Sequence, residues 1–218
     1  GGLAIGALTT WAALLDDPRI RGYGLLADAI PTIGDLQVRN RGTIGGSLAH
    51  ADPASDIAAP VLALEAELVA RSSARGERTI AASDFFIGPF ATALEPDEIL
   101  TEIRLPAGLP NAGSAYCALP SPASGYPIAG VAVVLIGQEA GAGVERCTVG
   151  VTGVGEQPYR SAEAERAVLD GASFADAAES ISVGQRISSD IHADREYRAA
   201  MAVVMARRAF EAAVARLS

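Results

Sequence analysis

The sequence predicts an α+β fold in two units, and three observations support this. Residues 114–119, 128–137 and 144–153 are apolar or alternating runs separated by glycine-rich turns, a pattern typical of an antiparallel meander. Three helical patterns follow these runs. The stretch between Pro106 and Asn111 is rich in Pro, Gly and Ala, which is typical of a domain boundary. We therefore expect one unit over residues 1–108 and a second, small domain over residues 109–218, formed by a three-stranded antiparallel sheet with helices.

The first unit is expected to combine strands with short helices, each recognised by its periodicity and its flanking turn residues. In chain order we expect an apolar strand at 1–8, a helix from Trp11 capped by Thr9 or Thr10, a helix at 23–33, a glycine loop, a helix starting near Ala54, strands at 67–72 and 77–81 with a turn at 74–76, a helical segment at 84–86, and a strand at 98–105 ended by Pro106.

The three helices of the second unit are expected at 161–169, 174–187 and 194–217. In the last of them Tyr197, Met201, Val204 and Met205 keep approximately helical spacing. Methionine and aromatic side chains on such a face normally pack in the core, so they are assigned no chemistry.

The most informative segment runs from Gln37 to Asp56 and contains the adjacent glycines Gly45 and Gly46 between hydroxyl residues. Glycine has no Cβ, so an anion can approach peptide N–H groups directly, and a following helix directs free donors outward. We expect the amides of residues 43–47 to bind the diphosphate of a nucleotide. The glycines could equally form a simple tight turn between a strand and a helix.

Charge and composition exclude several classes of function. The formal net charge is −9, and all 17 basic residues are arginine. The absence of lysine excludes Schiff-base chemistry and a lysine-based phosphate loop in this chain. The acidic balance and the scattered arginines argue against a nucleic acid partner. Cys117 and Cys147 form no C-x-x-C pair, so we expect neither an iron–sulfur cluster nor a structural zinc held by this chain.

Charge or glycine interrupts the apolar stretches well before about twenty residues, so no membrane span is expected. The sequence shows no basic-then-apolar leader typical of a signal peptide, and a cytoplasmic location is the expectation. A metal cluster of His50, Asp52 and Asp56 is conceivable. A His-x-Asp pair without a third well-spaced ligand favours loop hydrogen bonding and helix capping instead.

Three segments together resemble the FAD-binding medium subunit of the molybdenum hydroxylases, the family that includes the carbon monoxide dehydrogenase medium subunit and the flavin domain of xanthine dehydrogenase. They are Gln37–Asp56 with its Thr43-Ile44-Gly45-Gly46 core, Asp97–Pro106, and Ser124-Gly125-Tyr126. The resemblance covers the whole chain. It implies the C-terminal part of a two-subdomain flavin-binding domain at 1–108, followed by the family's C-terminal domain.

The resemblance implies an oxidoreductase subunit that binds FAD and takes electrons from the [2Fe-2S] clusters of a small partner subunit, while a large molybdopterin subunit oxidises the substrate. By position, the diphosphate would contact Thr43, Ile44, Gly45, Gly46 and Ser47, and Asp56 would accept hydrogen bonds from cofactor hydroxyls or an amide. Leu100 and Tyr126 match positions near the flavin ring system, where an aromatic face offers stacking. No catalytic acid or base is expected from this chain.

Two departures from the family pattern are visible. The resemblance implies that an N-terminal sub-domain carrying a first glycine loop, of the pattern Ala-Gly-Gly-x-Ser, is absent from this sequence. Relatives often carry lysine or arginine in the segment that here reads Cys117–Pro122, so a cationic contact is lost or supplied from elsewhere. Two alternative functions stay open: an interaction module with a vestigial flavin loop, and a stand-alone flavin oxidoreductase of the vanillyl-alcohol oxidase type.

Overall fold

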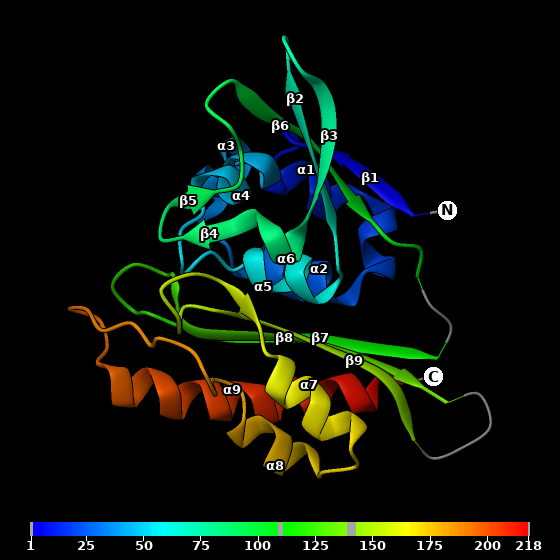
Figure 1. The fold of residues 1–218 in the computed structure, drawn as a ribbon, viewed down its shortest axis with the longest axis vertical. Helices are drawn as coiled ribbons and strands as arrows, with labels where there is room; N and C mark the ends of the chain where they lie inside the picture. Colours follow the sequence, from blue (N-terminus) through cyan, green and yellow to red (C-terminus); the bar gives the residue numbers. More distant parts are fainter. Residues whose placement is uncertain (1, 109–110, 139–142, 218) are drawn as a thin grey trace.

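The first unit is formed around a four-stranded antiparallel sheet. A computed structural model describes residues 2–108, 111–138 and 143–217. The sheet has the order β1-β6-β2-β3, so the last of these strands in the chain, β6, pairs with both β1 and β2 (Figure 1). Its strands are β1 (Leu3–Gly6), β2 (Glu67–Ser72), β3 (Gly76–Ala81) and β6 (Glu98–Leu105). A small pair, β4 (Phe86–Gly88) with β5 (Ala91–Thr92), lies beside it.

Short helices occupy most of the remaining chain of this unit. They are α1 (Trp11–Asp16), the 3-10 helix η1 (Pro18–Gly22), α2 (Gly24–Ala29), the 3-10 helix η2 (Ile30–Thr32), α3 (Leu36–Arg41), α4 (Ile44–His50), α5 (Ala58–Ala63) and α6 (Ala82–Phe85). Thr10 caps α1 by accepting a hydrogen bond from Ala13 N. The predicted helix at 23–33 is split, because Pro31 falls where α2 gives way to η2.

The predicted glycine loop is wrong, because residues 36–50 form two helices. Asp35 caps α3 by accepting from Val38 N, and Thr43 caps α4 by accepting from Gly46 N. Gly45 and Gly46 therefore lie in the first turn of α4. The next helix, α5, begins at Ala58, later than its expected start near Ala54.

The second unit contains the expected meander and one further strand. Its strands are β7 (Ala112–Pro120), β8 (Pro127–Gly137), β9 (Val144–Thr152) and the two-residue β10 (Tyr159–Arg160), in the order β10-β9-β8-β7. The helices are α7 (Ala162–Leu169), α8 (Phe174–Glu179) and α9 (Arg195–Ala215). The predicted helix at 174–187 is too long: α8 ends at Glu179, and Gly184 adopts φ +76° in the turns that follow.

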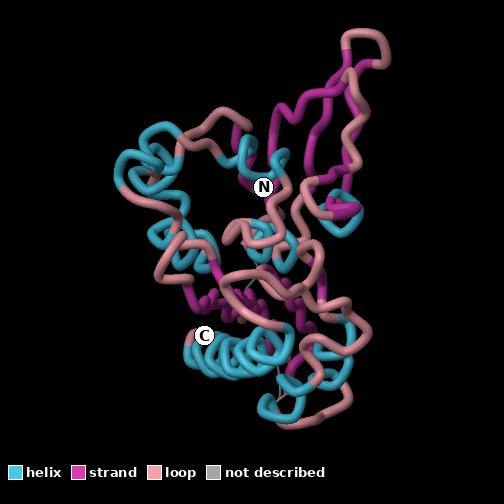
Figure 2. The backbone as a smooth tube through the Cα atoms, turned by 90° about the vertical axis from the view of Figure 1, so that its left-hand side faces the viewer, coloured by secondary structure: helices cyan, strands magenta, loops and turns pink. Residues whose placement is uncertain are grey.

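The second sheet is covered on both faces (Figure 1, and Figure 2 from the side). Helices α7 and α9 pack on one face with α8 beneath them, whereas α2 and α5 of the first unit pack on the other. Gly150 of β9 permits this close approach, since a Cβ there would lie 2.1 Å from the carbonyl oxygen of Ala59. The predicted α+β class is confirmed, and the two units share one buried interface.

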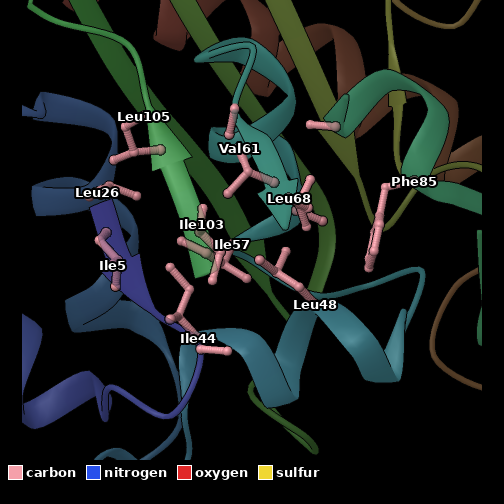
Figure 3. Packing of buried hydrophobic residues seen from close by; sticks show 14 of the residues in the cluster. Ile5, Leu26, Ile44, Leu48, Ile57, Val61, Leu68, Phe85, Ile103 and Leu105 are labelled. Carbon is pink, nitrogen blue, oxygen red and sulfur yellow. The ribbon is translucent and has the colours of Figure 1, made fainter. Parts of the chain in front are cut away.

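The core of the first unit fixes the orientation of α4. Figure 3 shows Ile44 of α4 pointing toward Ile5 of β1 and Ile103 of β6, and Leu48 lying beside Ile57; all of these side chains are buried. One face of α4 is thus committed to the hydrophobic core, and only the opposite face is available to a ligand. Among the helices that the structure describes, none has both the length and the apolar character needed to cross a membrane.

Candidate functional site: a cavity beside helix α4

A cavity of about 470 Å³ lies against the outer face of α4. Besides Trp11 of α1, three parts of the chain line it: residues of the segment 33–43, the outer face of α4 together with residues 52–56, and the loop residues Ser124, Gly125 and Tyr126 of the second unit. The cavity is therefore formed by both units, and its shape depends on how they pack together.

The outer face of α4 presents Thr43, Gly46, Ser47 and His50 to the cavity. These positions are three or four residues apart, so they lie above one another on one side of the helix. A Cβ added at Gly46 would lie 2.8 Å from Thr43 Oγ1, which is too close, but it would meet no other atom within 4 Å, so the position is otherwise open. The cavity wall at α4 therefore combines hydroxyl groups with a position that has no side chain.

The peptide N–H groups of residues 44–47 all donate within the chain, so binding of a diphosphate by the amides of residues 43–47 stays a prediction that these bonds do not favour. Ile44 N donates to Thr9 O at 3.1 Å and Gly45 N to Ala7 O at 2.9 Å. Gly46 N donates to Thr43 Oγ1 at 3.1 Å, and Ser47 N to Thr43 O at 3.0 Å. The physical cause is the docking of residues 7–10, which run antiparallel past Thr43 and supply the carbonyls. Any anion beside α4 must be held mainly by side chains.

Two predicted residues of α4 lie on its other face. Ile44 is fully buried in the core, and a Cβ on Gly45 would lie 2.3 Å from the Cβ of Ala7. Neither of them lines the cavity. Leu100 of β6 also lies outside the lining and packs against the core of the first unit. Ile44 and Gly45 therefore position α4, and the geometry gives no support for a contact between Leu100 and a ligand in this cavity.

Asp56 lies at the cavity and is nearly buried. Its Oδ1 accepts hydrogen bonds from the hydroxyl groups of Tyr116, at 2.8 Å, and Thr32, at 3.2 Å. Burial raises the pKa of the Asp56 carboxyl to about 6, although the hydrogen bonds from Tyr116 and Thr32 oppose this rise. Tyr116 belongs to β7, so the second unit orients the carboxyl group of the first. Both of these hydroxyl groups donate to Oδ1.

Tyr126 borders the cavity from the second unit, with 48% of its surface exposed. Its loop is closed by two backbone bonds, Ser121 N to Tyr126 O and Gly125 N to Ser121 O, both 2.8 Å. Partial burial raises the pKa of the Tyr126 hydroxyl, and the carboxyl groups of Asp52 and Asp56 add to the rise. A half-exposed aromatic ring at a cavity edge offers a flat surface for a ring system to stack on.

Several lining residues were not assigned to this site from the sequence. They include Trp11, Arg41, His50, Asp52 and Ser55. A helix predicted over residues 43–50 would have placed His50 on the same face as Thr43, Gly46 and Ser47, because it is three or four residues from the last two. Ser55 joins the wall through its hydroxyl, 2.9 Å from the hydroxyl of Ser47. Arg41 supplies a cation beside the hydroxyl-rich face, and over the described residues no group of three His, Cys, Asp or Glu side chains could hold a metal ion.

Two protein families match this chain along most of its length. Residues 1–108 match the FAD binding domain in molybdopterin dehydrogenase, and residues 114–213 match the CO dehydrogenase flavoprotein C-terminal domain. The carbon monoxide dehydrogenase medium chain of Hydrogenophaga pseudoflava is 37% identical over 98% of this chain and 75% of its own length. The glyceraldehyde dehydrogenase medium chain of Sulfolobus acidocaldarius is 35% identical over 90% of this chain and 68% of its own length.

Solved structures show the same architecture. Carbon monoxide dehydrogenase from Hydrogenophaga pseudoflava superimposes with a TM-score of 0.93 at 37% identity, covering 100% of this chain and 76% of that one. Quinoline 2-oxidoreductase from Pseudomonas putida 86 gives a TM-score of 0.89 at 28% identity, covering 100% of this chain and 77% of that one. The resemblance drawn from residues 37–56, 97–106 and 124–126 is confirmed. The chain belongs to the FAD-binding medium subunits of the molybdenum hydroxylase family.

Proposed function

We propose that this chain holds FAD in the cavity beside α4 and passes electrons from the [2Fe-2S] clusters of a small partner subunit to an external acceptor. A large molybdopterin subunit of the same complex would oxidise the substrate and select it. The observation that supports the proposal most directly is the cavity itself, in which Thr43, Ser47, Asp56 and Tyr126 converge from two units that both match this family.

The cavity offers the groups that a dinucleotide requires. The hydroxyl of Thr43 and one of the two mutually bonded hydroxyls of Ser47 and Ser55 can donate to phosphate oxygens, and the guanidinium of Arg41 supplies positive charge. Gly46 permits close approach of the ligand. Arg41 is the cationic contact that the segment Cys117–Pro122 does not provide. The diphosphate is thus assigned to side chains of the outer α4 face and to Arg41, in place of the backbone amides.

The remaining groups suit the other parts of the cofactor. The carboxyl of Asp56 accepts hydrogen bonds from ribityl hydroxyls or a ring amide, and Tyr116 fixes its orientation. Tyr126 covers one side of the ring system and excludes water from it. FAD, when bound, would supply redox chemistry that accepts single electrons and stores up to two, and the protein contributes its binding, orientation and electrostatic environment.

The test is whether the purified chain binds FAD, measured by flavin absorbance and by titration of the chain with FAD. We expect flavin absorbance bands in the protein as isolated, or their appearance when FAD is added. Ser47→Ala should weaken FAD binding about tenfold, because a hydrogen bond to a charged group is lost. Ser83→Ala is the matched control, since Ser83 is exposed and lies outside the cavity. Equal affinities for the two variants would contradict the assignment of Ser47.

The alternatives give different results in the same preparation. A colourless chain that binds no added FAD, yet co-purifies with a large and a small subunit, would support an interaction module with a vestigial flavin loop. A flavin-containing chain that oxidises a substrate without partners would support a stand-alone oxidoreductase. The proposed function requires flavin in the chain and reduction of that flavin only when the partner subunits and their substrate are present.

A further inference from the structure

Arg198 of α9 is the one arginine in the described part of the chain whose side chain is buried, with 4% of its surface exposed. Burying a guanidinium is costly unless its donors are paired. An apolar residue at a helix position that faces a sheet avoids this cost of desolvation, as at the neighbouring buried positions Ala202 and Met205. The placement of Arg198 therefore needs an explanation in terms of the groups that it contacts.

The guanidinium joins three separate segments. Nη1 donates to the carbonyl oxygen of Ile128 at 2.9 Å and to that of Gly153 at 2.5 Å, and Nη2 donates to Asp190 at 2.7 Å. Nε finds no partner within the described residues. Asp190 is itself held by the backbone N–H groups of His192 and Ala193. One side chain thus connects the start of β8, the residue after β9 and the loop before α9.

The two carbonyls lie where the sheet ends. The β7–β8 register shifts between Leu119 and Pro120, and the β8–β9 pairing ends at Gly130 and Thr152. Gly153 follows with φ +77°, and a Cβ there would lie 2.4 Å from the carbonyl oxygen of Pro127. Arg198 therefore supplies donors to β8 and to the segment after β9 just beyond the last residues that pair these two strands with each other.

Both segments, the start of β8 and the residues after β9, connect directly to the lining of the cavity. Tyr126 is two residues before Ile128. On the other side, Gly153 N donates to Pro53 O at 2.8 Å, and the Thr152 hydroxyl lies 2.9 Å from the carbonyl oxygens of Pro53 and Ser55. Pro53 and Ser55 belong to the segment Asp52–Asp56 that forms the opposite wall. The network of hydrogen bonds from α9 thus reaches two of the three parts that line the cavity.

We propose that Arg198 is a positioning residue of the cofactor site: by holding the carbonyls of Ile128 and Gly153, it sets the position of Tyr126 relative to the wall Asp52–Asp56. The planar guanidinium is required because its forked donors reach two carbonyls and a carboxylate at once, which the single ammonium of lysine cannot do. The inference rests on the proposed function only in that the cavity is taken to hold FAD.

The first test needs no cofactor and uses amide hydrogen exchange of the full chain. Arg198→Met should accelerate exchange about tenfold at Gly153, whose N–H is bonded to Pro53, and at Ser121 and Gly125 in the loop of Tyr126. Exchange in β2 and β3 of the first unit should stay unchanged. Arg207→Met is the matched control, because Arg207 lies on the same helix, is exposed and pairs only with Glu179 among the described residues.

Acceleration of equal size throughout the chain would show that Arg198 merely stabilises the fold, and no acceleration at Gly153 would show that it positions nothing. Either result overturns the inference. If Arg198→Met does not fold, Arg198→Lys takes its place, since it keeps the positive charge and loses only the fork. The same pattern of local acceleration is expected from that variant, with a smaller amplitude.

The second test uses FAD as the probe and reads the fluorescence of the bound flavin, which contact with the Tyr126 ring should quench. Arg198→Lys and Tyr126→Leu should each raise this fluorescence, and the double variant should show no further increase, since both changes act on one contact. An additive increase would overturn the inference. If the unsubstituted chain bound no FAD at all, the proposed function would fail, while the exchange experiment would still decide the part played by Arg198.

Discussion

The two faces of α4 differ in what their residues do, although they belong to one short helix. Ile44, Gly45 and Leu48 on the inner face are buried against β1 and β6, and the amide of Gly45 is bonded to Ala7. Gly46 and Ser47 on the outer face line the cavity. Adjacent glycines thus serve two purposes: one allows the helix to approach the sheet, and the other keeps the cavity open. The comparison separates residues that support the fold from residues that contact the ligand.

The largest effect is expected at the inner face. Gly45→Ala should lower the free energy of unfolding by about 3 kcal/mol, because the new Cβ meets the Cα and carbonyl oxygen of Ala7, which belong to the backbone and cannot move aside easily. Chemical denaturation measures this loss. Gly46→Ala is the counterpart on the outer face: its Cβ would meet only the side-chain oxygen Thr43 Oγ1, so the loss of stability should not exceed about 1 kcal/mol, the value of that cap, while FAD binding should weaken. Equal stabilities of the two variants would break the distinction between the faces.

The second prediction concerns Asp56 and its dependence on pH. Burial raises the pKa of this carboxyl from its ordinary value of 3.8 to about 6, so between these values the folded state binds more protons than the unfolded state. The stability contributed at this site therefore falls as pH rises through that window, and the full cost is present above about pH 6.

Asp56→Asn cannot ionise and avoids this cost. Relative to the unsubstituted chain it should gain about 2–3 kcal/mol on going from pH about 4 to pH about 7.5, measured by denaturant titration at both values. An unchanged difference between the two proteins at the two pH values would show that the carboxyl has an ordinary pKa. FAD binding should weaken in the same variant, because an uncharged amide is a poorer acceptor for cofactor hydroxyls.

A smaller effect is expected at the cap that joins the two faces. Thr43→Ala removes the acceptor for the N–H of Gly46 and should cost about 1 kcal/mol of stability, together with part of the FAD affinity. Thr43→Ser retains the hydroxyl and should restore both properties. If serine restored stability without restoring FAD affinity, the methyl group of Thr43 and not its hydroxyl would contact the ligand.

The smallest effect on stability is expected for Tyr126→Leu. The side chain is half exposed, and the bonds that close its loop are formed by the backbone, so the free energy of unfolding should change by no more than about 0.5 kcal/mol. The fluorescence and the reduction potential of bound FAD should change nevertheless. A large loss of stability would place Tyr126 among the residues that support the fold.

Local sequence patterns predicted much of the sheet structure. Strands β2 and β6 have the predicted bounds, and β7, β8 and β9 agree with the predicted meander to within two residues. Alternating burial and glycine turns are properties of neighbouring residues, so they can be read along the chain. The helix α4 was missed because glycine pairs favour turns, whereas its stability depends on the cap at Thr43 and on carbonyls supplied by Ala7 and Thr9.

Only part of the candidate site could be predicted from the sequence, because the site depends on contacts between distant residues. Thr43, Gly46, Ser47, Asp56 and Tyr126 line the cavity, whereas Ile44, Gly45 and Leu100 do not. The pairing of Asp56 with Tyr116 and the support from Arg198 bring together residues that are 60 and 45 or more positions apart, respectively. No local periodicity carries such information, because the Asp56–Tyr116 contact arises only when the two units pack together, and the Arg198 contacts only when α9 packs on the second sheet.

The contact between Gly150 and Ala59 has a consequence for protein engineering. The backbones of β9 and α5 are in direct contact here, since a Cβ added at Gly150 would lie 2.1 Å from the carbonyl oxygen of Ala59. No side chain between them can adjust to a change. A chimera that exchanges the C-terminal unit between relatives at residues 106–111 would therefore have to include α2 and α5 as well. If the two units were produced as separate polypeptides, each would expose an apolar surface that the other normally covers. The two units are separate along the chain, but each buries part of the other.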